Sequence, residues 1–235
     1  MRAKHWLAIP ALAALLIHGG NAWAEDHISS VETNAIDLTR ILAPPPAPGS
    51  AEDKADLDTV LKLQAERTEQ QAAECAADEE YSVFRFADVV GPAFDAALLP
   101  ATSAYFGKAI DIAKNAVESS KDHWNRPRPY QLDSRVRPCV KLSKHSSYPS
   151  GHACAGTAMT ILLADILPEK HDAVYARGQL YVWHRVMGGA HNPSDVLAGR
   201  IAGTVVAQQI LEDPQMQALA KAARTELRKA LKLPL

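Results

Sequence analysis

Three short clusters of residues in this 235-residue chain have the side-chain types needed to transfer a phosphoryl group without a metal ion. Cations can hold phosphoryl oxygens, one histidine can attack phosphorus, and a second can protonate the alcohol that leaves. The clusters are, in order, Lys121 with Arg128-Pro129, the run Pro149-Ser150-Gly151-His152, and Arg185 with His191 and Asp195.

The run at 149–152 is typical of a helix N-terminus that binds an anion. Pro149 fixes the entry, Ser150 can cap the helix or offer its hydroxyl, and Gly151 lets an anion approach the backbone amide. His152 then stands in the first turn, facing whatever is bound. Taken alone, the run fits a capping loop around a partly buried histidine better than an anion site.

His191 and Asp195 lie four residues apart, with Pro193 beginning a helix between them. This spacing lets the carboxylate hold one ring nitrogen and leaves the other free as a nucleophile. A structural His–Asp bond or a metal site remains an alternative, although the cations of the other clusters would repel a metal ion. Arg185, at the end of the preceding helix, can hold two phosphoryl oxygens with its guanidinium.

Lys121 and Arg128 complete the predicted phosphate cradle. Lys121 lies late in a predicted helix, and two prolines restrict the backbone around Arg128. Arg126 is interpreted either as unrelated to the site or as a residue that contacts the phosphate-binding residues without touching phosphate itself. Cations also suit a solvated helix C-terminus, so the inference depends on all three clusters occurring in one chain.

The rest of the chain predicts the elements that position these residues. No segment alternates as a strand would, and no repeat is visible, so we expect an all-α fold, a single-domain helical bundle with the motifs at helix ends. Residues 127–149 are predicted to be an irregular loop. Helices are expected at about 56–80, 102–124, 150–167, 169–187 and 193–213, with a last one near the C-terminus.

The N-terminus predicts export. Residues 1–24 combine a positive start, an apolar stretch and the small-x-small ending Ala22-Trp23-Ala24, which indicates a signal peptide cleaved after Ala24. Residues 25–50 are interpreted as an N-terminal arm with a proline-rich connector at 44–49, and residues 51–235 as the folded domain. We therefore expect a periplasmic protein.

Charge and cysteine content narrow the partners. The net charge is −2 and the basic residues are dispersed, so no nucleic-acid partner is expected. No later apolar stretch is long enough for stable membrane insertion. Three cysteines suggest a Cys75–Cys139 disulfide with Cys154 buried as a free thiol, although three reduced core cysteines fit nearly as well.

The three clusters resemble the signature of the PAP2 phosphatase superfamily, and the chain is most similar to the soluble, secreted class A bacterial acid phosphatases. The resemblance covers nearly all of the chain after the signal peptide, and His184 stands where that family usually has serine. It implies an all-α fold and a phosphohistidine mechanism with no metal or other cofactor, acting on small phosphomonoesters, and it leaves room for a homo-oligomer. Under it His191 is the nucleophile, polarised by Asp195, and His152 is the acid. The phosphate-binding groups would be Lys121, Arg128, Ser150, Gly151 and Arg185.

Two other functions remain open at this point. The cradle is also similar to that of vanadium-dependent haloperoxidases, because vanadate mimics the phosphoryl transition state. A non-catalytic protein that binds phosphate or a phosphorylated ligand would keep the cations, but it would have no use for His152, His191 and Asp195. The histidine pair predicts an acidic pH optimum for an enzyme. The walls that select the substrate are expected to come from Phe84, Tyr105, Tyr130 and Tyr148.

Overall fold

The computed structural model describes residues 36–235, which form one compact unit. The predicted signal peptide and its cleavage site after Ala24 lie outside the described residues. All regular structure between residues 36 and 235 is helical, which confirms the predicted all-α class. The α-helices are α1 (Ala51–Glu66), α2 (Glu69–Ala77), α3 (Ala87–Val90), α4 (Pro100–Trp124), α5 (Pro129–Leu132), α6 (Gly151–Ile166), α7 (His171–Met187), α8 (Pro193–Glu212) and α9 (Pro214–Ala230).

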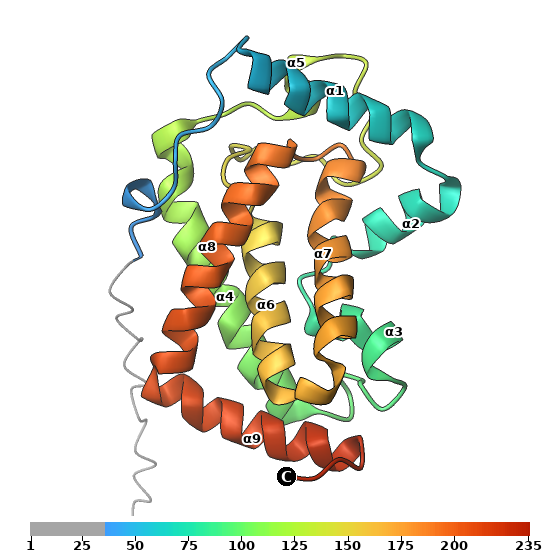
Figure 1. Cartoon of the computed structure of the whole chain (residues 1–235), viewed down its shortest axis with the longest axis vertical. Coiled ribbons are helices and arrows are strands. Elements are labelled where there is room, and N and C mark those ends of the chain that lie inside the picture. The colour runs from blue at the N-terminus through green and yellow to red at the C-terminus, as the bar shows by residue number, and fades with distance from the viewer. Residues whose placement is uncertain (1–35) are drawn as a thin grey trace, which may run out of the picture. The chain divides into compact units, whose positions relative to one another are not determined.

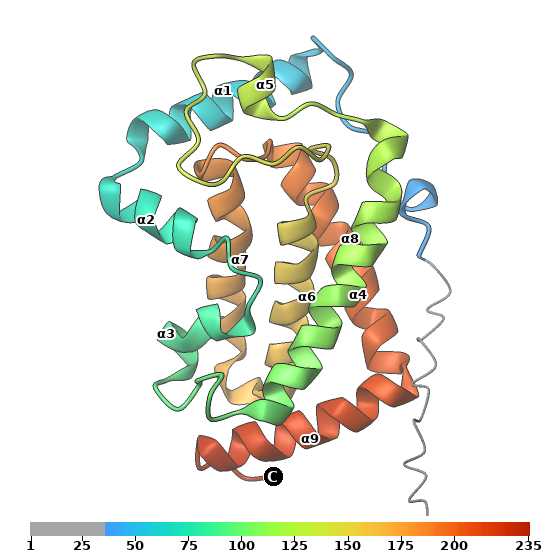
Figure 2. The same ribbon diagram turned by 180° about the vertical axis from the view of Figure 1, so that it is seen from behind.

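Helix α6 is the centre of the bundle and packs against α4, α7 and α8 (Figure 1). Helix α9 crosses one end of these helices, and α1 and α2 cover the opposite end (Figure 2). Short 3-10 turns, η1 (Leu38–Arg40), η2 (Val83–Phe86) and η3 (Pro168–Lys170), join or flank the helices.

Small residues allow α6 to be surrounded. Gly199 and Gly203 lie four apart on α8 and face the backbone of α6. A Cβ on Gly199 would meet the Ser150 carbonyl oxygen, and a Cβ on Gly203 would meet that of Cys154. The two helices therefore approach so closely that the start of α6 and the start of α8 lie together.

The N-terminal helical stretch differs from the prediction. The helix expected at 56–80 starts earlier, at Ala51, with the Ser50 hydroxyl accepting from the Asp53 amide at 3.2 Å, and it breaks after Glu66. Thr68 then caps α2 in a reciprocal pair with Gln71. The capping box Thr-x-x-Gln is the sequence signal that the predicted continuous helix overlooked.

Helix α4 begins two residues before its predicted start and ends at Trp124, where the C-cap Asn125, with a φ of 43°, turns the chain out of the helix. The predicted loop at 127–149 contains the short helix α5 and ends at a cis Tyr148-Pro149 bond. The C-termini of α4 and α7 and the N-termini of α6 and α8 consequently gather at the end covered by α1 and α2 (Figure 1).

Candidate active site

The three sequence clusters meet at that end of the bundle. A cavity of about 690 Å³ is lined by residues from α4, from the 141–145 loop and from the ends of α6 and α7. Ser150 and Asp195 are buried behind its wall instead of lining it. The predicted residues that line the cavity are Lys121, Arg128, Gly151, His152, Arg185 and His191.

The ring of His191 is buried and its two nitrogens have different partners. Arg128 Nη1 lies 3.1 Å from His191 Nε2, and because a guanidinium can only donate, Nε2 must carry a lone pair. The proton of the neutral ring therefore resides on Nδ1. Burial and the nearby Arg128 charge lower the pKa of His191 to about 3 despite the opposing effect of Asp195, so the ring is neutral at any ordinary pH.

Ser147 lies between His191 and Asp195. The His191 Nδ1 to Asp195 Oδ2 distance is 3.6 Å, longer than a hydrogen bond, whereas the Ser147 hydroxyl lies 3.3 Å from Nδ1 and donates to Asp195 Oδ2 at 2.6 Å. The backbone N–H of Asn192 donates to the same oxygen at 2.7 Å. The carboxylate thus acts on the nucleophile partly through a hydroxyl that the sequence motifs did not single out.

Arg126, for which the sequence left open either no role or a supporting one, forms a hydrogen-bonded ion pair with Asp195. Its Nη1 donates to Asp195 Oδ1 at 2.7 Å, and its Nη2 donates at 2.9 Å to both Asp53 and Asp56 of α1. Burial raises the pKa of Asp195, but His191, Arg126 and Ser147 outweigh it and leave that pKa below its usual value. Asp195 is therefore ionised, and a buried ion network ties it to the N-terminal helix.

Lys121 and Arg128 are held by backbone carbonyl groups of the loop that precedes α6. Lys121 Nζ donates to the carbonyls of Ser146 and Pro149 at 2.7 and 3.1 Å, and Arg128 Nε donates to that of His145 at 2.9 Å. Burial, reinforced by the Arg128 charge, lowers the pKa of Lys121 to about 8. Both cations are thus fixed in place before any anion arrives.

Arg185 has fewer polar partners than Lys121 and Arg128. Its guanidinium is buried, its closest carboxylate oxygen is Glu79 Oε1 at 3.9 Å from Nη2, and within the described residues Nε and Nη1 have no hydrogen-bond partner. Leaving a buried charged donor unpaired is costly unless a ligand satisfies it. Two unpaired guanidinium nitrogens beside His191 suit an anion with several oxygens, such as a phosphoryl group.

His152 stands in the first turn of α6 with one nitrogen already engaged. Its Nε2 lies 2.9 Å from the Glu79 carbonyl oxygen, which can only accept, so Nε2 carries the proton and Nδ1 is the second nitrogen. The Tyr81 ring covers it, with centroids 3.8 Å apart. Burial and the Arg185 charge lower the pKa of His152 well below its ordinary value.

The predicted substrate walls are wrong. Tyr105 and Tyr148 are buried in the core, and neither they nor Phe84 and Tyr130 line the cavity. Tyr148 and Tyr130 instead bind the backbone with their hydroxyls. The aromatic wall is Tyr81, and exposed lysines stand at the mouth: Lys114, Lys141 and Lys144.

The predicted Cys75–Cys139 disulfide is not formed, because the structure records Cys75, Cys139 and Cys154 as free thiols. Cys75 and Cys139 do pack in one small cluster, where burial raises the pKa of the Cys75 thiol to about 12. Cys154 is buried in α6, as expected.

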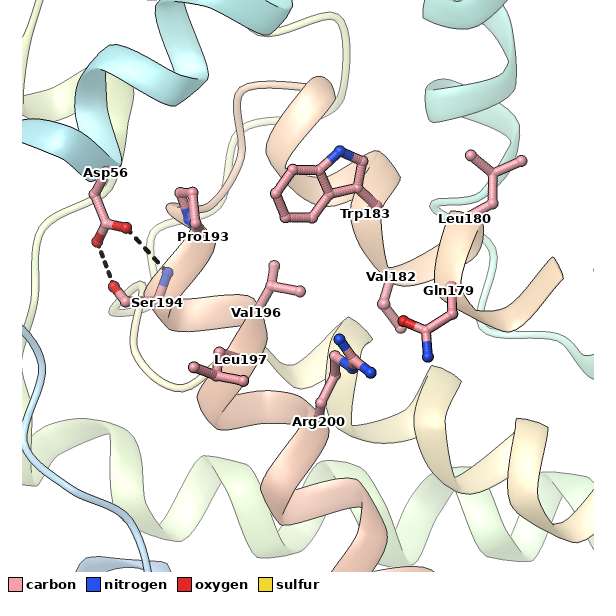
Figure 3. A pocket seen from close by; sticks show the side chains of 10 residues that line it. All are labelled: Asp56, Gln179, Leu180, Val182, Trp183, Pro193, Ser194, Val196, Leu197 and Arg200. Carbon is pink, nitrogen blue, oxygen red and sulfur yellow. Dashed lines mark hydrogen bonds between the residues drawn. The ribbon is translucent and has the colours of Figure 1, made fainter. Parts of the chain in front are cut away.

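A second cavity, of about 660 Å³, opens between α7 and α8 (Figure 3). Its walls are mainly apolar, with Trp183 and Leu197 at its edges and no histidine. Ser194 and Asp56, which are hydrogen-bonded to each other, form one corner (Figure 3). With no nucleophile or cation cluster, this cavity lacks the chemistry of the first.

Two further properties hold for residues 36–235. No three side chains of His, Cys, Asp or Glu are grouped closely enough there to hold a metal ion. In the same residues, each helix is either too short or too polar to cross a lipid bilayer.

A family model and several individual proteins are similar to this chain. The family model described as PAP2 superfamily matches residues 99–217. An acid phosphatase of Zymomonas mobilis is 31% identical over 198 residues, which cover 80% of this chain and 75% of that protein. Non-specific acid phosphatases of Providencia stuartii and Salmonella typhimurium are 29% and 30% identical, covering 85% and 79% of this chain and 84% and 78% of those proteins.

The fold also matches a solved structure, that of a transmembrane PAP2-type phosphatidylglycerolphosphate phosphatase from Bacillus subtilis. The TM-score is 0.52 at 15% sequence identity, and the match covers 78% of this chain and 90% of that chain. At this identity the similarity concerns the helical architecture alone.

Proposed function

The chain belongs to the PAP2 superfamily and is an acid phosphatase, and from that premise we propose that it hydrolyses small phosphate monoesters through a phosphohistidine on His191, without a metal ion. One observation carries the proposal. His191, whose Nε2 is unprotonated, and Arg185, whose buried Nε and Nη1 have no partner in the described residues, line the same cavity. The proposed nucleophile, His191, and an anion-binding group, Arg185, are therefore available to one bound phosphoryl group.

In the first step, the Nε2 lone pair of His191 attacks phosphorus opposite the ester oxygen. A nitrogen–phosphorus bond forms as the phosphorus–oxygen ester bond breaks. Arg185, Arg128, Lys121 and the amides at the start of α6 hold the equatorial oxygens, where positioning and electrostatic stabilisation supply most of the acceleration in phosphoryl transfer. The Ser150 hydroxyl, which accepts from the Ala153 amide at 3.3 Å, keeps that helix start in place.

His152 supplies the proton for the leaving alcohol. A bound phosphate dianion offsets the Arg185 charge and raises the pKa of His152, so that the ring is protonated only when substrate is present. After the alcohol leaves, neutral His152 takes a proton from water, which attacks phosphorus and breaks the nitrogen–phosphorus bond. Phosphate and free His191 result.

Asp195 stabilises the charge that develops on His191. As Nε2 bonds to phosphorus the ring becomes cationic, and the ionised carboxylate and Ser147 beside Nδ1 favour that form. The neighbouring cations act in the opposite direction and keep the resting ring neutral. The nucleophile is thus available at rest and stabilised once it has reacted.

We also infer that the enzyme is exported to the periplasm. The support is the positive, apolar and small-x-small pattern of residues 1–24, together with related proteins that are bacterial acid phosphatases. N-terminal sequencing of the protein from the periplasmic fraction should begin at Glu25. Recovery from the cytoplasm with residues 1–24 intact would contradict export.

The central test is hydrolysis of p-nitrophenyl phosphate at pH 5–6 with EDTA present. We expect EDTA-resistant turnover that His191→Ala abolishes, and a phosphoenzyme that is labile in acid and stable in base when the reaction is quenched. The matched control is His171→Ala, an exposed histidine far from the cavity lining, which should keep full turnover. Turnover that requires an added metal or vanadate, or phosphate binding with no turnover, would reject the proposed chemistry.

A further inference from the structure

Residues 78–81, between α2 and η2, form the wall that holds the proposed acid. The Glu79 carbonyl binds His152 Nε2 at 2.9 Å, and the Tyr81 ring stacks on the same imidazole. The Glu79 carboxylate also faces Arg185. The position of His152 consequently depends on where this segment lies.

One face of α7 fixes the segment. Arg177, Tyr181 and His184 are spaced by four and three residues and so point the same way. Arg177 Nη2 and His184 Nδ1 donate to the Asp78 carboxylate at 2.7 and 2.8 Å, and the Tyr181 hydroxyl donates to the Glu80 carbonyl at 2.8 Å. These contacts attach Asp78 and Glu80, the residues on either side of Glu79, to one rigid helix.

His184 is the member of this face nearest the active site, because the next residue along the helix is Arg185. Both His184 and Asp78 are buried, and in the described residues His184 Nε2 has no partner. The ring is therefore held by the Asp78 contact, which is its hydrogen bond to the segment.

We propose that His184 is a positioning residue for the leaving-group acid: by holding Asp78 it places the Glu79 carbonyl and the Tyr81 ring that orient His152. The inference rests on the role of His152 proposed above. It predicts a defect confined to the two proton transfers of His152, to the leaving alcohol and from the attacking water, since the cations and His191 are held by other contacts.

The test compares substrates whose leaving groups need the acid to different degrees. p-Nitrophenolate leaves readily unprotonated, whereas the alkoxide of an alkyl phosphate such as glycerol 2-phosphate does not. In His184→Leu we expect kcat/KM, which reports the step that expels the alcohol, to fall roughly tenfold more on the alkyl ester than on p-nitrophenyl phosphate, a fraction of the ~10²–10⁴ that a general acid contributes. His184→Asn keeps a donor at the Nδ1 position. It should restore the wild-type ratio of kcat/KM on the alkyl ester to kcat/KM on p-nitrophenyl phosphate.

The controls separate this inference from the function on which it rests. Asp88→Asn removes the exposed outer partner of Arg177, 3.1 Å from its Nε, and should leave the ratio unchanged. His152→Asn should lower the ratio most, and an unchanged ratio there would reject the proposed acid. A lowered ratio in His152→Asn together with a normal ratio in His184→Leu would reject the inference about His184 alone.

A milder variant keeps the test open if His184→Leu does not fold. Tyr181→Phe removes only the hydroxyl that binds the Glu80 carbonyl. It should lower the same ratio by less than His184→Leu is expected to. Equal losses on both substrates would indicate a general structural role and overturn the proposal.

Discussion

Arg126 is expected to stabilise both the fold and the nucleophile, and Arg126→Met tests this. The guanidinium is buried and hydrogen-bonds to Asp53, Asp56 and Asp195, so its removal leaves three carboxylates without their cation. Breaking a buried ion pair from one side costs ~3–5 kcal/mol. We take about 3 kcal/mol, the lower end of that range, because the Asp53 side chain is 20% exposed and water can partly replace the charge.

Urea denaturation measures this cost. With m values of about 1–3 kcal/mol/M, and the upper end suited to a unit of this size, the midpoint should fall by roughly 1 M. The matched control is Arg135→Met, which removes a highly exposed arginine from its pair with Asp133 and should leave the midpoint unchanged. Equal midpoints for the two variants would refute the idea that the Arg126 network stabilises the protein.

The pH dependence gives a second check on the same variant. The folded pKa of Asp195 is below its ordinary 3.8, so its contribution to stability is present above pH 3.8 and is lost as pH falls through the folded value. In Arg126→Met the Asp195 pKa should be lowered less, because the Arg126 charge is gone, so Asp195 should contribute less to stability above pH 3.8. The difference in free energy of unfolding between wild type and variant should therefore narrow below pH 3.8, and a constant difference would contradict the argument.

Three further predictions follow from individual residues. The pKa of His152 lies well below 6.5 in the empty site, and we propose that bound phosphate raises it. Since kcat/KM reports the free enzyme and kcat the enzyme–substrate complex, the basic limb of kcat should lie at higher pH than that of kcat/KM. Coincident limbs would refute this. Lys121, with a pKa of about 8, loses its charge above that pH, so KM should rise there in wild type but not in Lys121→Arg, and an equal rise in both would contradict a role for the Lys121 charge. Gly199→Ala places a methyl group against the Ser150 carbonyl and should lower stability by ~1–3 kcal/mol in thermal or urea denaturation, whereas an unchanged stability would show that α6 and α8 can separate.

The sequence predicted those parts of the site whose chemistry is written in short motifs. His152, Arg185 and His191 were singled out because their types and spacing suit phosphoryl transfer, and the structure brings them to one cavity. Helix ends were also readable, since proline and capping residues mark them. The start of α8 at Pro193 and the Ser150 cap of α6 are examples.

Contacts between distant segments could not be predicted in this way. Arg126 meets Asp53 and Asp56 across more than 60 residues, and a buried arginine has no local pattern that distinguishes it from a solvated one. The partner of His152 is a backbone carbonyl, that of Glu79, which every residue possesses. The aromatic wall was misassigned for a related reason, because only the attachment of residues 78–81 to α7 brings Tyr81 to the cavity.

The contacts of α1 and of residues 78–81 with the site have a practical consequence for the choice of truncated fragments. The region 99–217 that matches the family model contains every predicted site residue, yet it excludes α1 and the 78–81 segment. A fragment cut to that region would leave Arg126 without Asp53 and Asp56, and His152 without its carbonyl partner. A unit for expression, grafting or domain fusion therefore has to include α1 and residues 78–81, and the family match alone would place its N-terminal boundary too late.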